Sequence, residues 1–157
     1  MSTLNGSGSV AFGAGIASFA SNVQITGCTN RASFSGMYNG GITVGPVSMS
    51  SAFGSSDLAL NPSDSGYSLP ATITDCTNYG NLSGNAVAGI AMSAGEVLRC
   101  VNYGNIDGSM IAGIVATNIN VLTFSFFSTT NIQYCVNYGT LTGSELGGIA
   151  SQLALQN

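Results

Sequence analysis

The sequence predicts an all-β fold, a parallel β-solenoid (β-helix) built of coils of about 24 residues with two inserted excursions. Three observations predict it: one pattern recurs four times at matching offsets, glycines interrupt the short apolar runs every few residues, and the apolar positions lack a helical period. In a solenoid each coil lies on the previous one, about 4.8 Å away, so equivalent residues form ladders along the axis.

The repeated pattern is [I/V]-x-x-C-x-N-Y-G-x-[I/L]-x-G-x4-G-I. Its cysteines are 48, 24 and 35 residues apart, so the basic unit has about 24 residues and extra chain precedes the second and fourth copies. The first copy carries Arg31 and Ala32 in place of Tyr-Gly. The four coils are expected near residues 23–44, 73–92, 97–116 and 132–151.

The rest of the chain divides into a half-coil and two insertions, so residues 1–157 are expected to form a single repeat domain. The half-coil is expected near residues 8–20, which resemble the second half of the unit. The insertion near 45–70 is either a degenerate coil or an excursion, and its failure to place Gly-Ile at the expected offset favours the excursion. The insertion near 118–131 holds three phenylalanines that pack back onto the solenoid, contact a neighbouring subunit or bind a ligand. They are Phe124, Phe126 and Phe127.

Two ladders are expected inside the stack and one outside. Counting in twos from Cys76 places cysteines and asparagines in the interior and tyrosines on the surface, whereas the opposite phase would bury the tyrosines and expose the cysteines. Ile73 does not fit this count, so a corner or bulge is expected there, or one of the two residues faces outward. The asparagines are expected to join their side-chain amides up the stack, and the repeat glycines to turn the chain with positive φ. The ladder residues are Cys28, Cys76, Cys100 and Cys135; Asn30, Asn78, Asn102 and Asn137; and Tyr79, Tyr103 and Tyr138.

The pattern resembles the GLUG motif, a C-x-N-x-G-x-[I/V]-x-G-x4-G-I repeat of bacterial and some archaeal cell-surface proteins, among them adhesin-like proteins and immunoglobulin-A peptidases. The match covers roughly residues 23–152 without the insertions. The resemblance implies a secreted or surface-attached repeat region. It implies no peptidase activity, because that chemistry lies in a separate metal-binding domain and this chain has no histidine.

The composition argues against two classes of partner. Charged residues make up 5% of the chain, there is no lysine, and Arg31 and Arg99 are the only cationic side chains. Nucleic acids and anionic membranes need clustered positive charge, so neither is expected as a partner, and no segment is long and apolar enough for membrane insertion as a helix. A surface rich in Ser, Thr, Asn and Gly is common in extracellular β-rich proteins, and it lacks the charge that keeps sheet edges apart.

No catalytic, cofactor-binding or metal-binding residue is expected. The cysteines lie on successive coils without a C-x2-C pair, so they are expected as stacked thiols or as disulfides between neighbouring coils rather than as a zinc site. The serines have no partner base and the acids no catalytic spacing, although a glycan-cleaving site made of carboxylates alone stays open as a minor alternative. Asp57 and Asp64 are either calcium ligands or, as we favour, solvated loop acids.

The leading functional expectation is an extracellular structural protein that assembles head-to-tail with copies of itself into a surface filament, tube or sheath. Neither end of the stack has an obvious cap in the sequence, and open strand edges invite pairing. The alternative is a non-catalytic adhesin or binding module, cut from a longer surface protein, whose tyrosines or insertions contact a glycan or a host protein.

Overall fold

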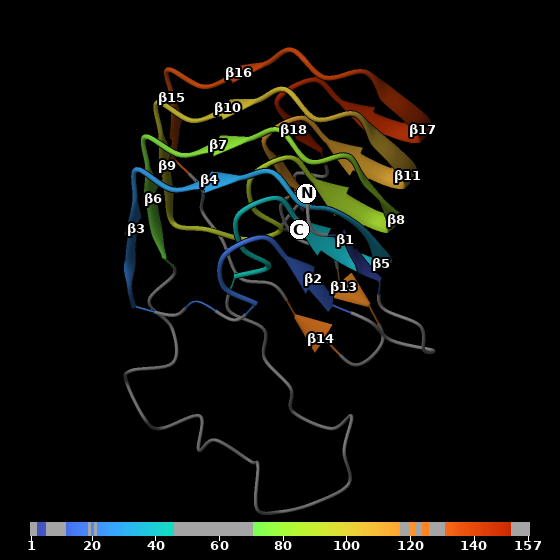
Figure 1. Cartoon of the computed structure of the whole chain (residues 1–157), viewed down its shortest axis with the longest axis horizontal. Coiled ribbons are helices and arrows are strands. Elements are labelled where there is room, and N and C mark those ends of the chain that lie inside the picture. Colours follow the sequence, from blue (N-terminus) through green and yellow to red (C-terminus); the bar gives the residue numbers. More distant parts are fainter. Residues whose placement is uncertain are drawn as a thin grey trace, which may run out of the picture.

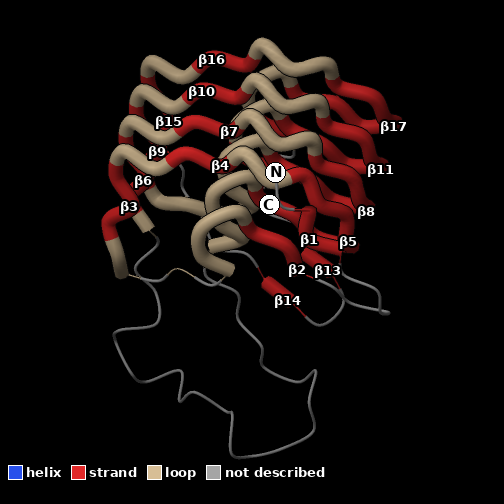
Figure 2. The backbone as a smooth tube through the Cα atoms, viewed as in Figure 1, coloured by secondary structure: helices blue, strands red, loops and turns tan. Residues whose placement is uncertain are grey.

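The structure, a computed structural model, describes residues 3–5, 12–18, 20, 22–45, 71–116, 120–121, 124–125 and 131–151. Its described residues contain many short strands and no helix, and the strands pair in parallel within stacked sheets (Figure 2). The predicted all-β class with parallel strands is therefore confirmed. Residues 46–70, with Asp57 and Asp64, lie outside the described residues, as do Phe126 and Phe127.

Each repeat contributes three strands joined by sharp corners. In the first repeat they are β3 (Gln24–Thr26), β4 (Thr29–Asn30) and β5 (Ser33–Gly40). In the second they are β6 (Thr72–Thr74), β7 (Thr77–Asn78) and β8 (Leu82–Ala88). In the third they are β9 (Glu96–Leu98), β10 (Val101–Asn102) and β11 (Ile106–Ala112), with β12 (Val115–Ala116) after them. In the fourth they are β15 (Asn131–Gln133), β16 (Val136–Asn137) and β17 (Leu141–Gly147), with β18 (Ala150–Ser151) after them.

Equivalent strands of successive repeats lie side by side, so the molecule is a stack of similar layers (Figure 1). The sheet orders are β3-β6-β9-β15, β4-β7-β10-β16 and β5-β8-β11-β17. A fourth column consists of single bridges that join Ala17, Thr43, Ala91 and Val115 in turn, continued by the pair β12–β18. The register joins consensus position to consensus position, as in the ladder Phe34–Leu82–Ile106–Leu141.

Two strands near the start of the chain form a partial layer below the first repeat. Strands β1 (Thr3–Asn5) and β2 (Phe12–Ala14) both pair with β5, one with each end of it. This half-repeat, with β1 and β2 as its described strands, lies under the second half of the first repeat only. None of the described residues pairs with the outer edges of β3 and β4. Separately from these sheets, β13 (Asn120–Val121) and β14 (Phe124–Ser125) form an antiparallel pair.

A tight corner explains why Ile73 and Cys76 are both buried although they are three residues apart. Asp75 lies between them with a φ of 55°, and the same position of the other repeats is also left-handed, at Gly27, Arg99 and Tyr134. One left-handed residue turns the chain between two strands, so the count in twos restarts after it. The corner predicted for this place is therefore the correct alternative.

The repeat glycines are required for a different reason from the one predicted. Within the described residues the only glycines with positive φ are Gly27 and Gly45, so the repeat glycines do not supply left-handed turns. A Cβ on Gly80, Gly104 or Gly139 would instead collide with the carbonyl oxygen of the preceding repeat at Ala32, Gly80 and Gly104 respectively. Glycine is needed here because the layers approach closely at this point, and only a residue without a side chain fits.

Candidate functional site

The asparagines form a continuous ladder through the four layers. The Nδ2 atoms of Asn30, Asn78 and Asn102 each donate to the Oδ1 atom of the next asparagine at 2.7 Å. The amides also close their own corners, since Asn78 Nδ2 donates to the Gly80 carbonyl and Asn78 Oδ1 accepts from the Gly80 N–H. Asn78 and Asn102 are fully buried, so these bonds satisfy polar groups that water cannot reach.

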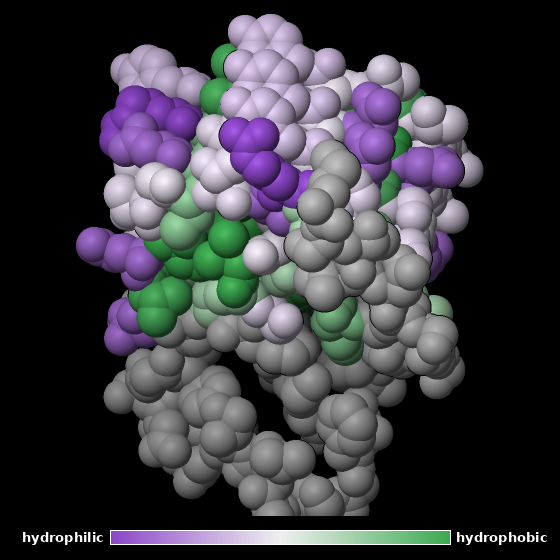
Figure 3. All heavy atoms as spheres, viewed as in Figure 1, coloured by the Kyte–Doolittle hydropathy of each residue, from purple (hydrophilic) through white to green (hydrophobic). Residues whose placement is uncertain are grey.

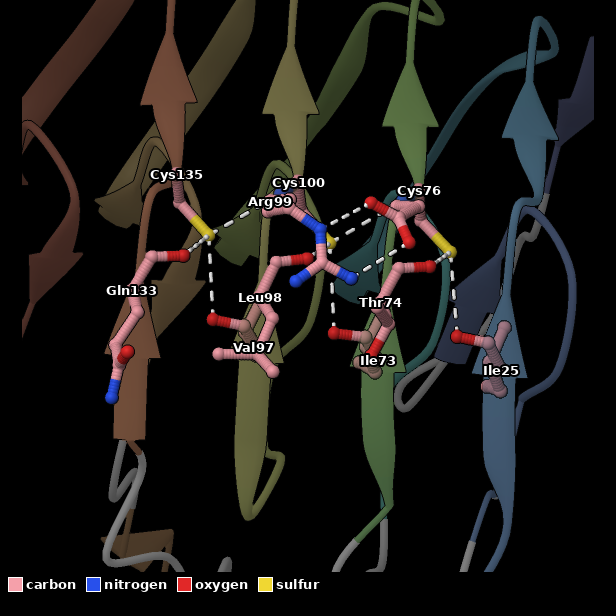
Figure 4. Close-up of polar contacts among 11 residues, drawn as sticks. Ile25, Ile73, Thr74, Cys76, Val97, Leu98, Arg99, Cys100, Gln133 and Cys135 are labelled. Atoms are coloured by element: carbon pink, nitrogen blue, oxygen red, sulfur yellow. Dashed lines mark hydrogen bonds and ion pairs between the residues drawn. The ribbon is translucent and has the colours of Figure 1, made fainter.

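The cysteines form a second interior row, of which Figure 4 shows Cys76, Cys100 and Cys135. Cys76 and Cys100 are fully buried, Cys28 and Cys135 are partly buried, and all four are free thiols. The Sγ of Cys76 lies 3.3 Å from the carbonyl oxygen of Thr74 and 3.6 Å from that of Ile25, in the preceding repeat. Cys100 and Cys135 repeat this arrangement, so each thiol packs between two neighbouring strands near the left-handed corner.

The thiol row separates the pKa values of its members. The hydrogen bond with Cys100 lowers the pKa of Cys76 to about 6 and that of Cys135 to about 7. The same two bonds, followed by burial, raise the pKa of Cys100. Burial, followed by the nearby Cys76, raises the pKa of Cys28. Cys135 is therefore the thiol that combines partial exposure with a lowered pKa.

The tyrosines form an exterior ladder in which each ring stacks on its neighbour. The Tyr79 and Tyr103 ring centroids are 4.9 Å apart with an angle of 4° between the planes, and those of Tyr103 and Tyr138 are 5.1 Å apart at 14°. The guanidinium of Arg31 lies 4.8 Å from the Tyr79 centroid and covers the lower end of the ladder. Tyr138 is 66% exposed, and its outer ring face is the one on which a further ring could stack.

One ion pair joins the second and third repeats at the left-handed corner. Arg99 Nε donates to Asp75 Oδ1 at 2.7 Å and Arg99 Nη2 donates to Asp75 Oδ2 at 2.9 Å. The hydrogen bonds from Arg99 lower the pKa of Asp75. Sequence reasoning missed this pair, although its signal is simple: both residues directly precede a repeat cysteine.

A polar column on the outer surface was also missed. The Asn81 N–H donates to Ser33 Oγ at 2.9 Å, and the N–H groups of Asn105 and Thr140 donate to the Oδ1 atoms of Asn81 and Asn105, each at 3.0 Å. Together with a second column two residues along, it borders a groove of about 550 Å³ that all four repeats line. The second column is Ser35, Ser83, Asp107 and Thr142. The sequence signal that could have revealed this column is that every copy of the repeat has a side chain able to form hydrogen bonds at the same offset.

The two ends of the stack differ, although the sequence suggested a cap at neither. At the first repeat, the half-repeat and Arg31 cover part of the end, and Ala32 occupies the position where every later repeat has glycine. Hydrophobic residues gather on the visible face beside β3 (Figure 3), and Ile16 and Val23 are each 45% exposed.

The fourth repeat supplies the last strands β15, β16 and β17 of its sheets. A Cβ on Gly41, Gly89 or Gly113 would meet the carbonyl oxygen of the following repeat, but one on Gly148 would meet nothing within 4 Å. Tyr138, Leu146 and Ile149 are exposed in this layer. Within the part of the chain that the structure describes, the fourth repeat therefore ends all three main sheets without cover, whereas the first repeat is unpaired only at β3 and β4.

The described residues hold no group of three or more His, Cys, Asp and Glu side chains that could ligate a metal ion. They also hold no helix long and apolar enough to cross a membrane. Of the three phenylalanines predicted as contacts, only the backbone of Phe124, in β14, lies within the described residues.

Comparison of the chain with family models, with curated proteins and with solved structures finds no match. The resemblance to the GLUG repeat therefore rests on the motif residues alone and stays a prediction.

Proposed function

We propose that this chain is a non-catalytic structural protein of the cell exterior that assembles head-to-tail with copies of itself. In this proposal it folds as a β-solenoid with a basic coil of about 24 residues, and the segments near 45–70 and 118–131 leave the stack as excursions. The observation that carries the proposal is the fourth repeat. It keeps the ladder residues Asn137, Tyr138, Gly139 and Gly148, and no following repeat within the described residues uses them.

The direction of the ladders supports a head-to-tail arrangement. All pairings between repeats are parallel, and the Nδ2 atoms of the ladder residues Asn30, Asn78 and Asn102 each donate to the following repeat. A further layer on the fourth repeat that continues both features must have the same orientation as the layers below it. A rotation that brings two fourth repeats face to face would reverse both, whereas head-to-tail contact continues them.

The half-repeat supplies the matching surface at the other end. Its strands β1 and β2 occupy the β5 column one layer below the first repeat. If they continue the ladders of a second molecule, Leu4 lies opposite Leu141 and Ala14 lies opposite Gly147. Arg31 and Ala32 limit the contact to this half of the layer, because an in-register layer below Ala32 would bring a carbonyl oxygen against its Cβ.

Composition supports both association and an external location. Only 5% of the residues are charged, and Glu145 is the single acid in the edge strand β17. Natural sheet edges avoid pairing mainly through charge, proline or cover, so this edge has little protection against strand addition. A contact limited to half a layer is small, and we expect assembly to need high protein concentration.

The test is electron microscopy and sedimentation across a concentration series, with the Gly148→Leu variant. The leucine enters open space in the single molecule, so the folded protein should keep its thermal midpoint while filaments or tubes disappear. Gln133→Leu is the matched control, because it adds the same side chain on the outer wall, where Leu98 stands one repeat earlier. Monomers at every concentration, or assemblies unaffected by Gly148→Leu, would contradict the proposal.

The alternative, a binding module for a glycan or host protein, has a narrower basis. The tyrosines stack on one another and on Arg31, so apart from the outer face of Tyr138 their faces are not available as a platform for sugar rings. A glycan-binding role would have to use another surface.

A further inference from the structure

The polar groove beside the β5-β8-β11-β17 sheet presents hydrogen-bonding groups at a regular spacing. Its two columns run along the stack axis and repeat with the distance between paired strands, about 4.8 Å. The first column is Ser33, Asn81, Asn105 and Thr140, and the second is Ser35, Ser83, Asp107 and Thr142. Between them the ladder from Phe34 to Leu141 packs inward, so Phe34, Leu82 and Ile106 lie beneath the groove and the two polar columns form its sides.

The ladder fixes the orientation of the amides in the first column. The Oδ1 atoms of Asn81 and Asn105 accept hydrogen bonds from the backbone of the following repeat. Their Nδ2 groups then point away from those bonds, and within the described residues they donate to no protein acceptor. The groove therefore offers donors that are held in place before any ligand arrives, which lowers the entropic cost of binding.

The second column adds hydroxyl groups and one carboxylate. Asp107 lies two residues from Asn105 in the same repeat, so an acceptor-only group and a fixed donor are close together. Neighbouring hydroxyl groups of a sugar, which both donate and accept, match such a pair. Ser83 and Thr142 flank Asp107 in the adjacent layers and can serve the next sugar on either side.

Other ligand classes fit this groove poorly. Asp107 is the only charged residue in its lining, which excludes a cationic surface for phosphates and gives a metal ion a single carboxylate. The strands beneath are paired on both sides at β8 and β11, so a peptide has no free edge to join there. No exposed aromatic side chain lines the groove, so a flat hydrophobic ligand has no platform.

We propose that this groove binds a linear, uncharged polysaccharide whose chain lies along the stack axis, with successive sugars against successive repeats. The site is independent of the stack ends, so it does not require the proposed assembly. Because four repeats line the groove, affinity should rise with oligosaccharide length up to roughly four sugars and change little beyond that. A ligand longer than the groove would continue along a neighbouring molecule only where the molecules are stacked.

The experiment has two parts. Native gel electrophoresis through linear neutral glucans, mannans, xylans and galactans identifies a polysaccharide that retards the protein. Titration calorimetry with its oligosaccharides, from one to eight sugars, then measures the length dependence on the unaltered chain. We expect retardation by at least one polymer and the length profile described above. No retardation by any polymer, or affinity independent of length, would overturn the proposal.

Two variants locate the site. Ser83→Trp and Asp107→Trp fill the groove and should each weaken binding at least tenfold, while Gln133→Trp, on the outer wall of β15, should leave it unchanged. Asp107→Asn keeps an acceptor oxygen and should stay within about threefold of the original affinity, with or without a chelator. A binding constant insensitive to both tryptophans, or lost with Asp107→Asn or chelator, would show a different site or a metal-mediated contact. The thermal midpoint of each variant checks folding, and the length series needs no variant.

Discussion

The corner after the ladder asparagine is Arg31 and Ala32 in the first repeat and Tyr138 and Gly139 in the fourth. Gly139 is required because the carbonyl oxygen of Gly104 lies directly below it, whereas Ala32 has no described layer below. Tyr138 continues a stack of rings, whereas Arg31 covers the lower end of it. The difference teaches that each consensus residue is required by one neighbouring layer in particular. Where the layer on that side is missing, another residue can take the position.

The largest effect should come from giving an interior glycine the side chain that the first repeat tolerates. Gly104→Ala places a methyl group against the Gly80 carbonyl, so the second and third layers must separate. We expect a loss of about 3 kcal/mol in the free energy of unfolding, or a failure to fold. Ala32→Gly should cost less than about 1 kcal/mol, through the added freedom of the unfolded chain alone.

Urea unfolding followed by circular dichroism measures both changes. Equal losses for the two substitutions would mean that close approach of the layers is not what selects glycine at this position.

A smaller difference should separate interior and terminal asparagines. Asn102→Ala leaves one hydrogen of the buried Asn78 Nδ2 group without its acceptor and leaves the Gly104 N–H with only its longer bond to the Asn78 carbonyl, so we expect a loss of about 3 kcal/mol. Asn137 is partly buried and water can replace its bonds, so Asn137→Ala should cost about 1 kcal/mol. The same unfolding experiment tests this, and a cost for Asn137→Ala as large as that for Asn102→Ala would show that the outer face of the fourth repeat is covered.

The thiols give the smallest effect, about tenfold in a reaction rate. With a pKa of about 7, Cys135 is roughly half thiolate at neutral pH, whereas Cys28, with a raised pKa, is almost entirely protonated. A disulfide reagent should modify Cys135 first, with a rate that rises through pH 7, and Cys28 about tenfold more slowly. Cys76 and Cys100 should react only on unfolding, because they are fully buried.

Mass spectrometry of the modified chain identifies the order. If Cys28 reacts as fast as Cys135 at pH 7, the two ends of the thiol row do not differ as the structure indicates.

The sequence allowed prediction of the ladders because stacking favours identical neighbours. Asn78 and Asn102 could be assigned to one column since each recurs at a fixed offset, and the same offsets predicted the parallel pairing of the strands. Strand β1 could not be assigned from the sequence, because only the stretch around β2 carries a recognisable Gly-Ile pair, at Gly15 and Ile16.

Other features could not be predicted, for physical reasons. The sequence alone does not tell whether a glycine is required by its backbone conformation or by the close approach of a neighbouring layer. The prediction of positive φ for the repeat glycines was wrong for this reason. The groove was missed because Ser33, Asn81, Asn105 and Thr140 share a hydrogen-bonding role without sharing an identity. The ion pair of Asp75 and Arg99 was missed because arginine is uncommon at a left-handed corner, so the sequence did not place Arg99 in one.

The positions of the two arginines have a consequence for digestion. The chain has no lysine, so a protease that cuts after basic residues has only Arg31 and Arg99 as sites. Arg31 lies against Tyr79, and Arg99 is held by Asp75 in a corner between two paired strands. Neither insertion contains such a site. Cleavage by trypsin-like enzymes must therefore wait for a layer to open, and the lifetime of the chain among such enzymes is set by the stability of the stack itself.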